Sequence, residues 1–150
     1  MVFCKKLHSL YLRGIINHKS IKVNSKNILT VIGVLNILQG IGFFIGAETL
    51  TKQSFPAELL EGGGLIVGTA MHWPLSVACI VIGIIILSTR SLEMKDAKKV
   101  LLSIGIAYLF FLINGLLQHL TSPVNVPMQA LGFIAFISIL AFFTAFRKTT

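Results

Sequence analysis

The sequence predicts an all-α integral membrane protein, a four-helix bundle with the N- and C-termini in the cytoplasm. Two observations predict this fold. Four long apolar stretches fill most of the 150 residues, and each approaches the ~20 residues that a helix needs to cross a bilayer. Every Lys and Arg except Lys52 lies within residues 1–27, 90–99 and 147–148. Because Lys and Arg mark the cytoplasmic ends of spanning helices, these clusters predict the topology.

The composition favours a membrane protein over a soluble or nucleic-acid-binding one. Hydrophobic residues make up 55% of the chain and charged residues 12%, whereas about 25% charge is usual in soluble domains. The net charge of +8 does not predict nucleic-acid binding, because the basic residues bracket apolar stretches. Their expected partner is the anionic headgroup layer of the lipid bilayer. The stretches show no two-residue alternation, so helices are predicted rather than a barrel.

Residues 1–27 form the predicted basic cytoplasmic tail. A cleaved signal peptide is not predicted, because this basic region is too long and no small-x-small site follows the first span. On a helical wheel, four apolar residues of the tail share an arc of about 140°, opposite Lys6 and Arg13. They are Leu7, Leu10, Tyr11 and Ile15. Two interpretations stay open: an amphipathic helix on the inner leaflet, or a disordered tail that only enforces topology.

Residues 28–146 form the predicted membrane bundle. Its spans are predicted at 28–47, 70–88, 100–120 and 126–146. The second apolar run is longer than a span needs, and Pro74 lies inside it. Proline fits the first turn of a helix but not its middle. The regular part of this span is therefore predicted to begin near His72 and Trp73, after a flexible approach at Gly62–Gly64.

The connectors predict how the spans are arranged. Segment 48–64 holds three Glu and one Lys, and segment 121–127 holds no charge, so both are placed outside the cell. Residues 56–61 are predicted to form a short helix on the outer surface, and 147–150 a basic cytoplasmic end. The connectors 89–99 and 121–127 are short. Spans two, three and four are therefore predicted to form adjacent antiparallel hairpins.

Polar residues within or beside the spans are the candidate site, because burying them in lipid is costly. The candidate ligand-binding residues are Asn36, Gln39, His72, Asn114, Gln118 and His119. Part of the third span forms a stripe within about 60° of the helix circumference. Its members are Ser103, Ala107, Asn114 and Gln118. With the termini inside, most of these residues gather in the extracytoplasmic half of the bundle.

Two interpretations of these polar residues stay open. They hold the helices together through interhelical hydrogen bonds, or they line an outward-facing pocket for a small amphipathic ligand such as a lipid or quinone. In the first interpretation Gly33, Gly40 and the pair Gly42 and Gly46 let helices approach closely.

No catalytic residue, metal site or cofactor is predicted. The two histidines near the spans lie on different helices and no carboxylate lies within a span. Cys4 and Cys79 do not form a C-x-x-C motif, so a dithiol redox site is not predicted. The chain is therefore expected not to be an enzyme.

The layout of residues 28–146 resembles that of DoxX-like small membrane proteins. The resemblance rests on four helices, a longer first outer segment and the basic inner connector TRSLEMKDAKK; the third span, YLFFLINGLLQHL, is compatible with it. It implies an accessory membrane subunit linked to redox complexes, or a protein of unknown role. It carries over no functional residue.

The expected function is therefore that of a non-catalytic accessory subunit or scaffold of a larger membrane complex. A Phe-rich surface is expected to contact either the partner protein or only lipid. Its residues are Phe133, Phe136, Phe142 and Phe143. The alternative is a binder or carrier of a lipid, quinone or similar ligand. Expected partners are the bilayer and either a larger complex or a second copy, with no nucleic acid. The expected location is the bacterial cytoplasmic membrane, because FRKTT is not an endoplasmic-reticulum retention signal.

Overall fold

The computed structural model describes residues 25–147, which form helices and short connections with no strand in that range. Four of the helices are long and apolar enough to cross a membrane, as predicted. They are α2 (Ser25–Ile45), α5 (Gly64–Ser88), α6 (Met94–Thr121) and α7 (Met128–Phe146). The predicted amphipathic helix of the tail lies outside the described residues. Residues 148–150, from the predicted basic segment at the C-terminus, lie outside them as well.

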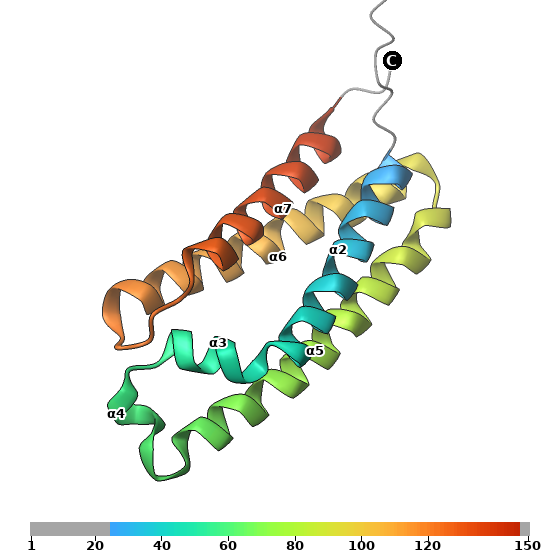
Figure 1. Cartoon of the computed structure of the whole chain (residues 1–150). Helices are drawn as coiled ribbons and strands as arrows, with labels where there is room; N and C mark the ends of the chain where they lie inside the picture. The colour runs from blue at the N-terminus through green and yellow to red at the C-terminus, as the bar shows by residue number, and fades with distance from the viewer. Residues whose placement is uncertain (1–24, 148–150) are drawn as a thin grey trace, which may run out of the picture.

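The four long helices form two pairs, α2 with α5 and α6 with α7. Figure 1 shows the pairs close together where α2 begins and α7 ends, and apart at the opposite end. We call the first the basic end, because Arg90, Lys98, Lys99 and Arg147 lie there. The second is the connector end, which carries the segments between α2 and α5 and between α6 and α7. Contacts between the pairs come mainly from α2, which touches both α6 and α7.

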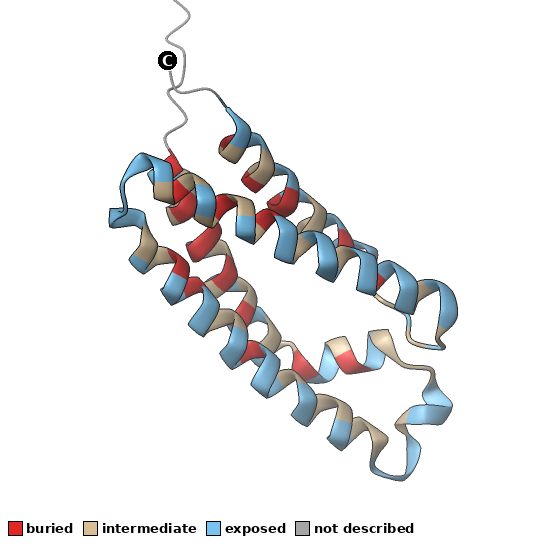
Figure 2. Ribbon diagram, turned by 180° about the vertical axis from the view of Figure 1, so that it is seen from behind, coloured by how far each residue is buried: buried red, intermediate tan, exposed pale blue. Residues whose placement is uncertain are grey.

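The apolar core lies where the two pairs meet, toward the basic end (Figure 2). It draws residues from all four long helices: Leu29, Ile32, Ile86, Ala97, Leu101, Ile137 and Ala141. The Lys98 ammonium donates a hydrogen bond of 2.5 Å to the Arg147 carbonyl oxygen, so it ties the start of α6 to the end of α7. Most other large apolar side chains of the long helices face outward.

The pairing of α2 with α5 contradicts the predicted arrangement of hairpins. α6 and α7 are adjacent as predicted, but α5 packs along α2 rather than along α6. Glycines explain this choice. A Cβ on Gly33 would lie 3.0 Å from the Gly83 carbonyl oxygen, and one on Gly83 would lie 2.7 Å from the Gly33 oxygen. Close backbone packing therefore outweighs the short connector between α5 and α6.

The predicted start of regular helix near His72 is wrong. α5 begins at Gly64 and continues through Pro74 to Ser88. Pro74 supplies no amide hydrogen, so the Ala70 carbonyl loses its helical donor. A long apolar helix tolerates one such defect because its remaining backbone bonds stay intact. Gly62 and Gly63, with φ of 59° and 98°, make the turn that precedes this helix.

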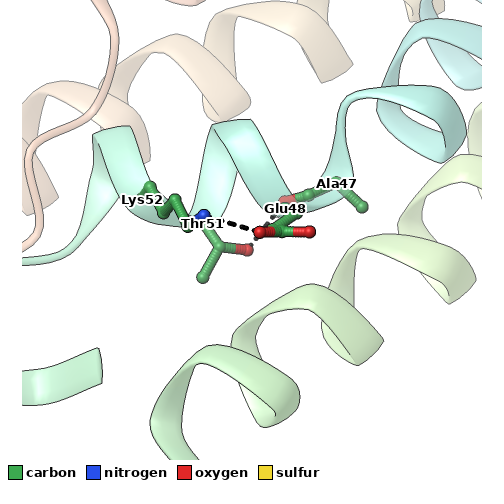
Figure 3. Close-up of polar contacts among 4 residues, drawn as sticks. All are labelled: Ala47, Glu48, Thr51 and Lys52. Carbon is green, nitrogen blue, oxygen red and sulfur yellow. Dashed lines mark hydrogen bonds and ion pairs between the residues drawn. The ribbon is translucent and has the colours of Figure 1, made fainter. Parts of the chain in front are cut away.

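The first connector contains more helix than was predicted. The short helix expected at residues 56–61 is present as α4 (Ala57–Leu60), followed by the 3₁₀ turn η1 (Glu61–Gly63). A further helix, α3 (Ala47–Ser54), packs on α5 at the connector end. In α3 the Thr51 hydroxyl donates to the Ala47 carbonyl, and Lys52 pairs with Glu48 at 2.6 Å (Figure 3). The Lys52 ammonium lowers the pKa of the exposed Glu48 carboxyl, but solvent screens such a pair.

Candidate functional site

Asn36 lies at the junction of the two helix pairs. Its side chain is 2% exposed, and both ends of its amide are used. The nitrogen donates to the Ile32 carbonyl of its own helix at 2.9 Å. The Tyr108 hydroxyl of α6 donates to the Asn36 Oδ1 at 2.5 Å. This hydrogen bond connects the two pairs, which fits the structural interpretation of Asn36.

Tyr108 was missed from the sequence, although an aromatic hydroxyl within an apolar span is a usable signal. Two serines were missed in the same way, and each joins the two helices of one pair. The Ser76 hydroxyl of α5 donates to the Gly40 carbonyl of α2 at 2.6 Å. The Ser138 hydroxyl of α7 donates to the Gly105 carbonyl of α6 at 3.0 Å. Small side chains beside glycines thus add hydrogen bonds to close backbone contacts.

His72 lies against α3 near the connector end. Its Nδ1 is 2.8 Å from the Gly68 carbonyl oxygen and 3.3 Å from the Thr51 hydroxyl oxygen. Because a carbonyl only accepts, we assign the proton to Nδ1. The ring of Phe43 stands edge-on to the imidazole, with centroids 6.4 Å apart. His72 Nε2 makes no hydrogen bond to a residue in 25–147, so in the neutral ring it remains an acceptor.

His119 and Gln39 make no side-chain hydrogen bond within the part of the chain that the structure describes. His119 lies in the last turn of α6. Its Nδ1 is buried without a partner, the only such side-chain atom among residues 25–147. Gln39 is half-buried on α2.

Asn114 and Gln118 are exposed on α6. The buried residues of this helix, Leu101, Gly105 and Gly115 among them, face its partners. At 100° per residue, Asn114 lies about 100–180° around the helix from these three residues, and Gln118 about 60–140°. Neither side chain bonds to a described residue. These two amides therefore point away from the chain's own bundle.

No protein family, curated protein or solved structure matches this chain. The candidate site therefore rests on the geometry of the chain itself.

An outward face of α6 is the candidate functional surface. We call it the α6 stripe. Its residues are Ser103, Ala107, Phe110, Asn114, Leu117 and Gln118, all exposed. They fall within an arc of about 100°. The Ser103 hydroxyl donates to the Lys99 carbonyl of its own helix at 3.1 Å, which leaves the two amides as the side chains of the stripe without a partner in the described chain.

The six residues predicted as a ligand site do not form one hydrogen-bonded cluster. Asn36 bonds to Tyr108 and His72 lies against Thr51, while no hydrogen bond joins two of the six. Binding of an amphipathic ligand by these residues stays a prediction. Within residues 25–147 no group of three His, Cys, Asp or Glu side chains is placed to hold a metal ion.

The predicted Phe-rich surface is only partly present. Phe136 and Phe143 are exposed on α7. Phe133 packs against the core cluster instead. Phe142 lies over Gly105 and stacks on Phe146, with ring centroids 6.2 Å apart. The sequence pattern did not separate these two sets, because phenylalanine is favoured both in lipid and in helix contacts.

The Gly42 and Gly46 pair does not pack helices together within the described chain. A Cβ on Gly42 would meet no atom within 4 Å, and one on Gly46 would meet only its own neighbourhood, Gly42 and Leu50. Gly33 and Gly40 do have the predicted packing role, because a Cβ on either would lie closer than 3.0 Å to atoms of α5.

Proposed function

We propose that this chain is a non-catalytic integral membrane protein that acts as a scaffold or accessory subunit, and that the α6 stripe attaches it to another membrane-spanning helix. The observation that carries the proposal is the exposure of Asn114 on an apolar helix. The DoxX-like layout of the chain agrees with a subunit role.

The position of Asn114 along α6 determines the depth of its amide in the proposed membrane span. It lies about 15 residues beyond Lys99, or about 22 Å along the helix axis. With Lys98 and Lys99 at the membrane surface, this places the amide inside a hydrocarbon layer ~30 Å thick. An amide without a hydrogen-bond partner there costs several kcal/mol. A polar group on a neighbouring helix removes that cost, so Asn114 favours association.

The proposed topology has the basic end in the cytoplasm and the connector end outside, in a bacterial cytoplasmic membrane. Reporter fusions are expected to show an active cytoplasmic reporter after Thr150 and an active extracytoplasmic reporter when inserted at Gly62. The basic clusters supply the physical reason. A matched fusion at Ser91, which is exposed between α5 and α6, serves as the internal cytoplasmic control. An extracytoplasmic signal at Thr150 would contradict the four-span topology.

Removing both amides from the α6 stripe is expected to release the chain from its complex. In membranes solubilised with a mild detergent, the double variant Asn114→Leu and Gln118→Leu should migrate on native gels as a smaller species than the wild type. The reason is that leucine contacts lipid as well as it contacts a helix, so the preference for a polar partner is lost. The measurement is the apparent mass of the chain, detected by an epitope tag.

A matched control uses Leu109 and Leu116, which are exposed on other sides of α6. The double variant Leu109→Ile and Leu116→Ile should keep the wild-type migration. The thermal unfolding midpoint of each variant in detergent separates loss of association from loss of folding. An unchanged migration of the Asn114 and Gln118 variant would count against the proposed surface.

A further inference from the structure

We propose that the outer face of α7 binds an anionic phospholipid, with the lipid phosphate at Arg147 and an acyl chain along the helix. The lipid class is one whose headgroup carries a phosphodiester and no cation, such as phosphatidylglycerol. The inference rests on the membrane placement in the proposed function. It goes beyond that function because it assigns a different surface to a different occupant.

Exposed apolar residues form this outer face of α7, which we call the α7 stripe. They are Phe136, Ile139, Phe143 and Phe146, with exposed fractions of 54%, 68%, 61% and 73%. At 100° per residue they fall within about 80° of the helix circumference, and Arg147 extends the arc to about 100°. The buried residues of α7, such as Ile137 and Ala141, belong to the core between the helices. The α7 stripe therefore points away from the chain's own bundle, and one of its ends meets a cation.

The length of the α7 stripe matches one leaflet of a bilayer. Arg147 follows Phe136 by about 11 residues, or about 16 Å along the helix axis. Half of a hydrocarbon layer ~30 Å thick is about 15 Å. With Arg147 at the level of the phosphates, the stripe covers the depth of an acyl chain of the same lipid. None of its side chains can form a hydrogen bond, so the stripe offers no polar contact to another helix.

The charges at the end of the α7 stripe favour an anionic headgroup. Arg147 is exposed and forms no ion pair with a residue in 25–147. The Lys98 ammonium lies 2.5 Å from the Arg147 carbonyl oxygen, so α6 brings a second cation to the same place. The Asp96 carboxylate, which is close to Lys98 in the sequence, is paired with Lys99 at 2.9 Å. A guanidinium can hold a phosphate through two parallel hydrogen bonds.

A zwitterionic lipid fits this end of α7 less well. Its headgroup carries an ammonium of its own, which cancels the charge of the phosphate and adds a cation beside Arg147 and Lys98. Basic groups between spanning helices are typical sites for anionic headgroups. Among the described residues, cations outnumber carboxylates at the basic end, whereas three Glu and one Lys lie at the connector end. The preference for an anionic lipid is therefore expected at the basic end only.

Quenching of tryptophan fluorescence by brominated lipids tests this site. The chain contains one tryptophan, Trp73, which is exposed on the part of α5 nearer the connector end. The variant Trp73→Phe with Phe143→Trp moves this reporter onto the α7 stripe. The full chain is reconstituted in phosphatidylcholine vesicles that contain equal amounts of either brominated phosphatidylglycerol or brominated phosphatidylcholine. The ratio of the two quenching constants should favour phosphatidylglycerol about fivefold, which is the attraction of about one nearby cation.

Two controls locate this preference at the α7 stripe. The wild-type chain, whose reporter is Trp73, should show no comparable preference. In the reporter chain, Arg147→Gln should lower the preference at least about twofold. Arg90→Gln should leave it unchanged, because Arg90 is an exposed cation at the same end but lies in the 3₁₀ turn η2 (Thr89–Ser91), between α5 and α6. Equal effects of the two variants would show a general attraction by the basic end and would overturn the site.

Other outcomes also overturn the proposal. Equal quenching of the tryptophan at position 143 by the two lipids would show that the α7 stripe does not select an anionic headgroup. If neither lipid quenches that tryptophan while both quench Trp73, a protein helix covers the stripe instead. Circular dichroism checks that the reporter chain keeps its helix content. If Phe143→Trp loses helix, Phe146→Trp on the same stripe takes its place.

Failure of this inference can be told from failure of the proposed function. The attachment surface is tested by the migration of the Asn114→Leu and Gln118→Leu chain on native gels, which does not depend on lipid selectivity at α7. A missing lipid preference with a changed migration overturns the lipid site alone. If neither brominated lipid quenches either tryptophan, the membrane placement is wrong and both proposals fail.

Discussion

The variant Gly40→Ala is expected to lose about 1–3 kcal/mol of unfolding free energy, whereas Gly42→Ala on the same helix is expected to keep or gain stability. A Cβ on Gly40 would lie 2.6 Å from Ile80 Cγ1 and 2.7 Å from the Ser76 carbonyl oxygen. The second contact is with backbone, so α2 and α5 must move apart to relieve it. That movement also weakens the hydrogen bond from the Ser76 hydroxyl to the Gly40 carbonyl.

The Gly42→Ala variant is a close control for Gly40→Ala. Both glycines lie in α2, so both substitutions add the same methyl group and the same gain in helix propensity, up to about 1 kcal/mol. Only the surroundings differ, because Gly42 faces open space. Unfolding in detergent mixed with increasing sodium dodecyl sulfate, followed by circular dichroism, measures the difference. If both variants unfold at the same detergent composition, the close packing of α2 on α5 is not what holds this pair together.

The second large effect is expected at the hydrogen bond between Asn36 and Tyr108. The single variants Asn36→Leu and Tyr108→Phe should each lower the unfolding free energy by about 1–3 kcal/mol. The first leaves the half-buried Tyr108 hydroxyl without its partner, and the second leaves the buried Asn36 oxygen without its partner. The double variant should cost less than the sum of the two by about 0.6–2 kcal/mol. The reason is that no orphaned oxygen remains once both polar groups are gone.

Thr30→Val provides the control for this cycle. Its hydroxyl is also on α2, but it bonds only to the Lys26 carbonyl of the same helix. It should change stability little and show no coupling with Tyr108→Phe. The same unfolding assay gives all the free energies. A coupling energy near zero between Asn36 and Tyr108 would mean that the pairs are joined by apolar contacts alone.

Much of the fold was predictable because lipid restricts the choices. Long apolar stretches in a bilayer form helices, and four such helices are present, although the second begins at Gly64 rather than near His72. The pairing of α5 with α2 was not predictable from connector lengths. It depends on which glycines face each other across two helices. The positions of Gly33 and Gly83 along the chain do not by themselves show that these two residues are in contact.

The candidate site was predictable only as a set of residues. The sequence singled out Asn36 and Asn114 by the same argument, that an amide in a span is costly. The structure gives them opposite surroundings, since Asn36 is buried against Tyr108 and Asn114 is exposed. Periodicity places the stripe of α6 on one face. It does not say whether that face meets the chain's own bundle or points away from it.

At the connector end, one hydrogen bond among the described residues reaches across the two helix pairs, from the Asn125 amide to the Ser54 carbonyl at 2.8 Å. A bond of this kind is worth about 1 kcal/mol, which shifts an equilibrium only about fivefold. The basic end, in contrast, is fastened by a buried core. The contacts between the two helix pairs are therefore strong at the basic end and weak at the connector end. We expect any change in the separation of the two pairs to be larger at the connector end than at the basic end.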